Sequence, residues 1–119
     1  MTAPRHVIGL DLGTSGVKAV LLAEDGTLRA EASAPLAVSR PQPLWSEQSP
    51  SDWWQALQQV MDQLAREHGA ALGRLEGVGL SGQMHGAVLL DDTHEVLRPA
   101  ILWNDGRSGA QCEALARAV

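Results

Sequence analysis

The sequence predicts an α/β domain with a mixed β-sheet, and three observations lead to that fold class. Apolar strand-like segments joined by glycine turns open the chain, one long segment with helical spacing follows, and further strand-like segments come after it. Strands that alternate with a helix are typical of α/β architecture. With 119 residues, the chain is long enough for one domain with a modest core.

The first third of the chain predicts an antiparallel meander of three strands. Val7–Leu12 and Val17–Ala23 are apolar segments on either side of a glycine turn. The pair Asp25-Gly26 is a strong signal for a two-residue hairpin. We therefore expect Thr27–Ala34 to be the third strand.

A long helix is predicted after a proline-containing loop over residues 35–50. Ser49 suits the N-cap and Pro50 suits the first helical position. The helix is expected to end near His68-Gly69, where the glycine would serve as the C-terminal cap. Trp53 and its neighbour Trp54 are interpreted mainly as packing residues. The apolar positions with helical spacing are Trp53, Ala56, Leu57, Val60, Met61 and Leu64.

The rest of the chain predicts short strands, turns and a final helix. The expected elements are a strand at Leu75–Ser81, a tight turn at Gly82–Gly86, a strand at Ala87–Leu90, a turn at Asp91–His94, an extended segment from Val96 to Trp103 and a helix over residues 108–119. The apolar pattern of that last helix reaches Val119 without a stop signal, which predicts a truncated piece of a longer protein.

Composition excludes several classes of protein. The net charge of −5 gives no sign of a nucleic-acid surface. The single cysteine, Cys112, excludes an internal disulfide framework and is interpreted as a small packing residue in the last helix. No segment approaches the length of a membrane-spanning helix. We therefore expect a cytoplasmic protein with no nucleic-acid or membrane partner.

The turn between the first two strands is a candidate phosphate site. Asp11 stands at a strand end, where it could hold Mg²⁺ or the water around it. Gly13 and Gly16 can take a positive φ, and the backbone N–H groups with the hydroxyls of Thr14 and Ser15 can donate to phosphate oxygens. The alternative is a simple hairpin turn. The segment is neither a Walker A loop nor a dinucleotide-binding fingerprint.

Two further segments carry side chains that suit a sugar. Gln83 and His85 can hydrogen-bond to hydroxyl groups, although a turn histidine bonded to the backbone is the alternative. Trp103 could pack against sugar C–H groups while Asp105 binds hydroxyls. For Asp105 the alternative is a helix cap, with Arg107 pairing locally.

Taken together, these segments resemble the N-terminal part of the FGGY carbohydrate kinases. The resemblance covers nearly the whole chain, and the runs Gly82–Gly86 and Leu97–Arg107 are similar to the xylulokinase branch of the family rather than the glycerol-kinase branch. The matching segments are Gly9–Lys18, Ser39–Pro41, Pro43–Gln48, Trp53-Trp54, Gly82–Gly86 and Leu97–Arg107.

The resemblance implies a fold and a reaction. The fold is an RNase-H-like domain of the actin and hexokinase superfamily, with residues 1–119 forming the N-terminal part of the N-terminal domain. The reaction transfers the γ-phosphate of ATP, with Mg²⁺, to D-xylulose or a similar ketose. The C-terminal nucleotide-binding domain and the general base, an aspartate, would lie outside this chain, so the chain alone is expected to be inactive. A homodimer is a further expectation, for which the sequence gives no direct sign.

The resemblance also implies residue roles. Asp11 matches an acid at the Mg²⁺–phosphate site that is not the general base, and it would bind the metal directly or through water. Gly13, Thr14, Ser15 and Gly16 match the first phosphate turn. The residues that match the sugar-binding segments are Gln83, Met84, His85, Trp103 and Asp105.

Two other functions stay open at this point. A kinase of the same family could act on another ketose or a polyol, because most of the residues that would choose the sugar are not in this chain. A non-catalytic sugar-binding or sensor module could keep the fold without turnover. A second glycine-rich phosphate loop further along the protein would favour the kinase.

Overall fold

A computed structural model describes residues 4–119 of the chain, which group into two compact units. The first, here called the sheet unit, contains residues 4–37 and Ser51–Gln83. The second, here called the loop unit, contains Val38–Pro50 together with Met84–Val119.

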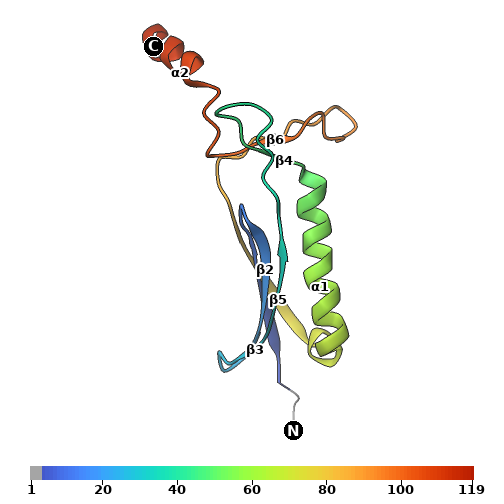
Figure 1. The fold of residues 1–119 in the computed structure, drawn as a ribbon. Helices are drawn as coiled ribbons and strands as arrows, with labels where there is room; N and C mark the ends of the chain where they lie inside the picture. Colours follow the sequence, from blue (N-terminus) through green and yellow to red (C-terminus); the bar gives the residue numbers. More distant parts are fainter. Residues whose placement is uncertain (1–3) are drawn as a thin grey trace. The chain divides into compact units, whose positions relative to one another are not determined.

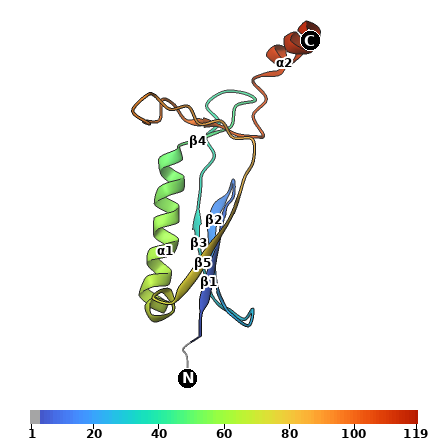
Figure 2. The ribbon, with the colours of Figure 1, turned by 180° about the vertical axis from the view of Figure 1, so that it is seen from behind.

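The sheet unit is built on a four-stranded mixed sheet with the strand order β3-β2-β1-β5 (Figure 1). Its strands are β1 (His6–Leu12), β2 (Gly16–Ala23), β3 (Leu28–Pro35) and β5 (Leu75–Gly82). The first three form the predicted antiparallel meander, and β5 pairs with β1 in parallel. Figure 2 shows β5 and β1 from behind. The predicted mixed sheet is confirmed.

The long helix α1 (Pro50–Leu72) packs against one face of this sheet and forms the core with it. Strand residues alternate between two faces, so Ile8 and Leu10 of β1 are buried while Asp11 is exposed. The helix contributes its buried stripe to the same core: Ala56, Val60 and Leu64. The opposite face of β1 is therefore open and carries Asp11.

The C-terminal end of α1 differs from the prediction. His68 has non-helical angles (φ −138°, ψ 39°), but the helix resumes and runs to Leu72. Gly69 does not act as a left-handed cap, because Gly26 is the one glycine with a positive φ among residues 4–119. Instead the Gly69 carbonyl accepts a hydrogen bond from Gly73 N at 3.1 Å, which continues the helical pattern.

Two side chains that were expected to pack lie on the surface. Trp54 is 60% exposed, and its neighbour Trp53 is only partly buried, because the buried stripe of α1 begins at Ala56. Cys112 is also exposed, because α2 (Gly109–Ala118) has no buried residue. The helix α2 itself confirms the predicted final helix within one residue at each end.

The loop unit contains a short pair of strands that was expected to be partly loop. β4 (Glu47–Gln48) pairs antiparallel with β6 (Ala100–Ile101). A two-residue strand carries almost no local signal, and its conformation is set by a partner more than 50 residues away.

Within residues 4–119, neither helix has both the length and the hydropathy of a membrane-spanning segment.

The predicted strand at Ala87–Leu90 is wrong. Ala87 bridges to Ile101, whereas Leu90 bridges to Val96, so the segment has two different partners and forms no continuous ladder. The turn at Asp91–His94 is confirmed by the hydrogen bond from His94 N to Asp91 O at 3.0 Å.

Candidate functional site

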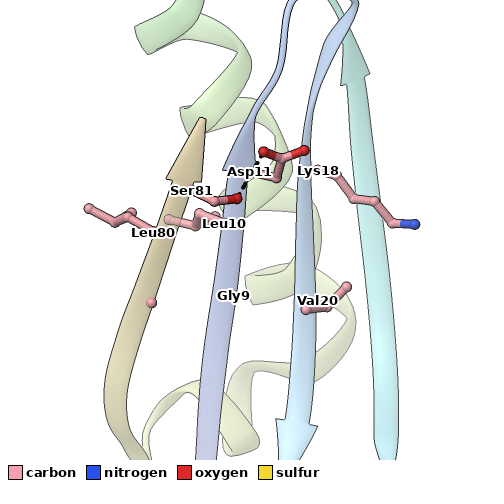
Figure 3. A pocket seen from close by; sticks show the side chains of 8 residues that line it. Gly9, Leu10, Asp11, Lys18, Val20, Leu80 and Ser81 are labelled. Carbon is pink, nitrogen blue, oxygen red and sulfur yellow. Dashed lines mark hydrogen bonds between the residues drawn. The ribbon is translucent and has the colours of Figure 1, made fainter. Parts of the chain in front are cut away.

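Asp11 lies near the end of β1 with its carboxylate on the open face of the sheet. Ser81, its register partner on β5, donates a hydrogen bond from Oγ to Asp11 Oδ1 at 2.9 Å (Figure 3). Lys18 is the register partner on β2, but its ammonium group points away and pairs with Glu31 at 3.0 Å. The Asp11 carboxylate is thus oriented by a hydroxyl and not neutralised by the neighbouring lysine.

A shallow hollow of about 340 Å³ lies around this carboxylate. Gly9 and Gly79 are a register pair within it, so β1 and β5 carry no side chain at the position two residues before Asp11 and Ser81. An aspartate next to exposed strand backbone is accessible to a hydrated cation or a bulky charged group. The lining residues are Gly9, Leu10, Asp11, Lys18, Val20, Gly79, Leu80 and Ser81.

Asp11 offers one exposed carboxylate, which is a type of donor that Mg²⁺ accepts. Within residues 4–119 there is no group of three or more His, Cys, Asp or Glu side chains that could hold a metal ion. Mg²⁺ keeps several waters and usually takes only one or two carboxylates, with phosphate oxygens completing its coordination. A lone, exposed Asp11 meets that requirement.

The turn between β1 and β2 is tight and its glycines serve a different purpose from the one expected. Gly13 N donates to Gly16 O at 2.9 Å, which closes the turn. Neither residue has a positive φ, so that part of the prediction is wrong. The physical reason for glycine is close approach: a Cβ on Gly16 would lie 2.8 Å from the Ala34 carbonyl oxygen of β3.

Gln83 is tied to this turn. The hydroxyl of Thr14 donates to Gln83 Oε1 at 3.1 Å, and Gln83 N donates to Leu12 O at 2.9 Å. Ser15 is exposed, and its carbonyl accepts from Leu36 N. The structure therefore brings together Asp11, the turn and Gln83 within the sheet unit, and leaves the Ser15 side chain on the surface of the turn.

The loop unit presents the apolar and imidazole groups that suited a sugar. Met84 is 71% exposed and Trp103 is 58% exposed. His85 is exposed and has a φ of +63°, a conformation that non-glycine residues adopt rarely and that clusters at functional sites. Among residues 4–119 no hydrogen bond joins the His85 side chain to the backbone, so the bonded-histidine alternative gains no support.

Asp105 is placed differently, because its side chain is only 2% exposed. Arg107 donates to it from Nε and from Nη2, the latter at 2.6 Å, and Ser46 N donates to Oδ2 at 2.7 Å. These hydrogen bonds, those from Arg107 foremost, hold the pKa of the Asp105 carboxyl well below its usual range. Local pairing with Arg107 is confirmed, but the helix-cap role is wrong since the helix begins at Gly109.

A buried group of charges around Arg107 was missed by the sequence reasoning. Glu47 is 5% exposed and pairs with Arg98 at 2.5 Å and with Arg107 at 3.7 Å. The Arg107 guanidinium also lies 3.7 Å from the centre of the Trp45 ring. An acid two residues after a tryptophan, in a loop with prolines on both sides, was a sequence signal for a fixed carboxylate, but Arg98 and Arg107 lie far from Glu47 along the chain.

Residues 6–119 match the N-terminal domain of the FGGY family of carbohydrate kinases. Among curated relatives, the chain is 55% identical over 108 residues to a xylulose kinase of Escherichia coli, covering 91% of this chain and 22% of that protein. A xylulose kinase of Bacillus subtilis is 43% identical over the same share of each chain. The chain thus spans about a fifth of the length of these relatives.

Solved structures agree with the fold. A xylulose kinase from Rhodospirillum rubrum superposes with a TM-score of 0.92 at 39% identity, covering 97% of this chain and 24% of that one. A kinase from Brucella ovis gives a TM-score of 0.90 at 49% identity, covering 93% and 23%. A glycerol kinase from Plasmodium falciparum, 17% identical with a TM-score of 0.86, shares the fold. The predicted fold class, that of the actin and hexokinase superfamily, is confirmed.

Proposed function

Because the chain belongs to the FGGY family of carbohydrate kinases, we propose that it is part of an ATP-dependent kinase that converts D-xylulose to D-xylulose 5-phosphate. The observation that carries the proposal is an exposed Asp11 carboxylate at a strand end beside a glycine turn, within a chain 55% identical to a xylulose kinase. Residues 1–119 would form the N-terminal part of the enzyme's N-terminal domain, and the nucleotide-binding domain would follow.

The geometry of the sheet unit supports a role for its residues on the phosphate side of the site. Mg²⁺ bound to the nucleotide would neutralise phosphate charge and help to align the transferred group. Asp11 would face that ion, most simply through water, and Ser81 would orient the carboxylate. Ser15 would offer its hydroxyl to phosphate, while Thr14 fixes the turn through Gln83. Gly13 and Gly16 would allow the backbone of the turn to stay compact.

The sugar side would be formed by the loop unit. Trp103 and Met84 expose apolar surface suited to the C–H groups of a ketose, and His85 can donate or accept a hydrogen bond with a hydroxyl. The general base would come from the remainder of the enzyme, so residues 1–119 alone should be inactive. A cytoplasmic location and a homodimer belong to the same proposal.

The phosphate-side proposal is tested by Asp11→Asn in the full-length enzyme, with ADP release followed in a coupled assay. Loss of a charge contact made to the transferring group should lower kcat by roughly 100- to 1,000-fold while the sugar KM changes little. The matched control is Glu24→Gln, an acid-to-amide change in an exposed ion pair with Arg5, which should leave both values unchanged. A near-normal kcat for Asp11→Asn would remove Asp11 from the phosphate site.

The choice of sugar is tested with a panel of D-xylulose, D-ribulose, D-gluconate and glycerol. The proposal expects the highest kcat/KM for D-xylulose. A higher value for another member would reassign the substrate within the family, and binding of a sugar without ADP release would favour a sensor module.

A further inference from the structure

We propose that Asp105 is a positioning residue that fixes the turn carrying Trp103, and that it does not itself bind the substrate. The inference rests on the proposed function, in which the exposed Trp103 faces the sugar. From the sequence, Asp105 was a candidate to bind sugar hydroxyl groups. Under this proposal it holds the turn in place instead.

The hydrogen-bonding capacity of Asp105 is already used. Oδ1 accepts from the backbone N of Arg107 at 2.9 Å and from its Nε at 2.9 Å. Oδ2 accepts from Ser46 N at 2.7 Å and from Arg107 Nη2 at 2.6 Å. A carboxylate has about four acceptor positions, so all of them are engaged inside the unit. With a side chain that is 2% exposed, Asp105 has neither the access nor the lone pairs for a sugar.

The backbone on both sides of Trp103 is fastened to one segment, residues 44–46. Leu102 N donates to Ser46 O at 3.0 Å, and Gly106 N donates to Leu44 O at 2.7 Å. Leu44 has a φ of +69°, which is unusual for a bulky residue and requires such support. The bond from Ser46 N to Asp105 lies between these two contacts. We call these three hydrogen bonds between residues 44–46 and residues 102–106 the clamp; it fixes the backbone around Trp103, which is itself 58% exposed.

Arg107 gives the clamp its geometry. Its guanidinium meets Asp105 as a fork, lies against the Trp45 ring, and is within 3.7 Å of the buried Glu47 carboxylate. A planar fork that also stacks on an aromatic ring cannot be reproduced by a lysine ammonium group. Arg107→Lys should therefore loosen the turn even though it keeps the charge.

The test is a double-mutant cycle in the full-length enzyme with Asp105→Asn, Trp103→Ala and both changes together. Asp105→Asn should raise the KM for D-xylulose roughly tenfold and leave the KM for ATP within about twofold. If Asp105 acts through Trp103, the double variant should be no more than about twofold worse than Trp103→Ala alone. Arg107→Lys should reproduce the Asp105→Asn effect, and the exposed Glu95→Gln should have none.

Additive effects in the cycle, an equal rise in both KM values, or an unchanged sugar KM would each overturn the proposal. Amide hydrogen exchange over residues 102–107 separates this inference from the proposed function. If the wild type releases no ADP with any sugar, the proposed function fails, yet exchange should still be about tenfold faster in Asp105→Asn or Arg107→Lys than in wild type. Unchanged exchange in both variants would refute the clamp itself.

Discussion

Replacing Gly16 with alanine should destabilise the β2–β3 edge of the sheet. The added Cβ would stand 2.8 Å from Ala34 O and 3.6 Å from Pro35 Cα. The obstacle is backbone, so no side-chain rotation relieves it. β3 is also held close by the hydrogen bond from Leu36 N to Ser15 O at 2.9 Å, and moving β3 away would strain that bond.

The expected magnitude follows from the cost of forcing a methyl group into filled space. Overpacking of this kind costs about 1–3 kcal/mol, and every 1.4 kcal/mol changes an equilibrium constant about tenfold. Opening of β3 from β2 should therefore become roughly 5- to 150-fold more frequent.

Hydrogen exchange measured by mass spectrometry on the full-length protein reports this opening locally. Amides of residues 28–36 should exchange faster in Gly16→Ala by that factor. Gly69→Ala is the matched control, because a Cβ there meets nothing within 4 Å and lies in helix α1. The control should leave residues 28–36 unchanged and stabilise the helix by roughly 0.4–1 kcal/mol. Unaltered exchange in Gly16→Ala would refute the close-approach explanation of this glycine.

Two more predictions concern the core and the buried acid. Leu64→Ala, at a fully buried position of α1, should cost about 2–5 kcal/mol and lower the thermal unfolding temperature; an unchanged temperature would mean that the helix is not packed as described. Asp105 has a pKa below the unfolded value of about 3.9, so its stabilisation is present above that pH and is lost as pH falls below about 4. The difference in urea midpoint between wild type and Asp105→Asn should therefore shrink between pH 7 and pH 3, and a constant difference would contradict this assignment.

Elements with strong local signals were predictable from the sequence. The meander follows from alternating apolar residues and Asp25-Gly26, and the start of α1 follows from Pro50 with its apolar stripe. The helix was predicted to end too early because glycine permits a left-handed cap without requiring one, and Gly69 stays helical enough to bond Gly73. The strand pair β4–β6 was missed because its conformation depends on pairing between distant segments.

In the candidate site too, features set by neighbouring residues were predictable, whereas features set by distant segments were not. Asp11 and its turn were identifiable because the acid, the glycines and the hydroxyls are neighbours in the sequence. The environment of Asp105 was not identifiable from the sequence. Its carboxylate is held inside the loop unit by a hydrogen bond from Ser46 N, and that donor lies 59 residues away along the chain. Whether a carboxylate is exposed or saturated is a tertiary property, and residue type alone does not determine it.

The parallel pairing of β5 with β1 also has a consequence for how the protein is made. Ser81 lies 70 residues after Asp11, whereas the β1–β2–β3 hairpins are local and can pair early, since short-range contacts close with less loss of chain entropy. During N-to-C synthesis, β1 would present an unpaired edge for the whole time that α1 is being added, and such an edge invites association with other chains. Slow elongation through residues 36–74 would lengthen that interval, so the yield of soluble protein should depend on translation speed over that stretch.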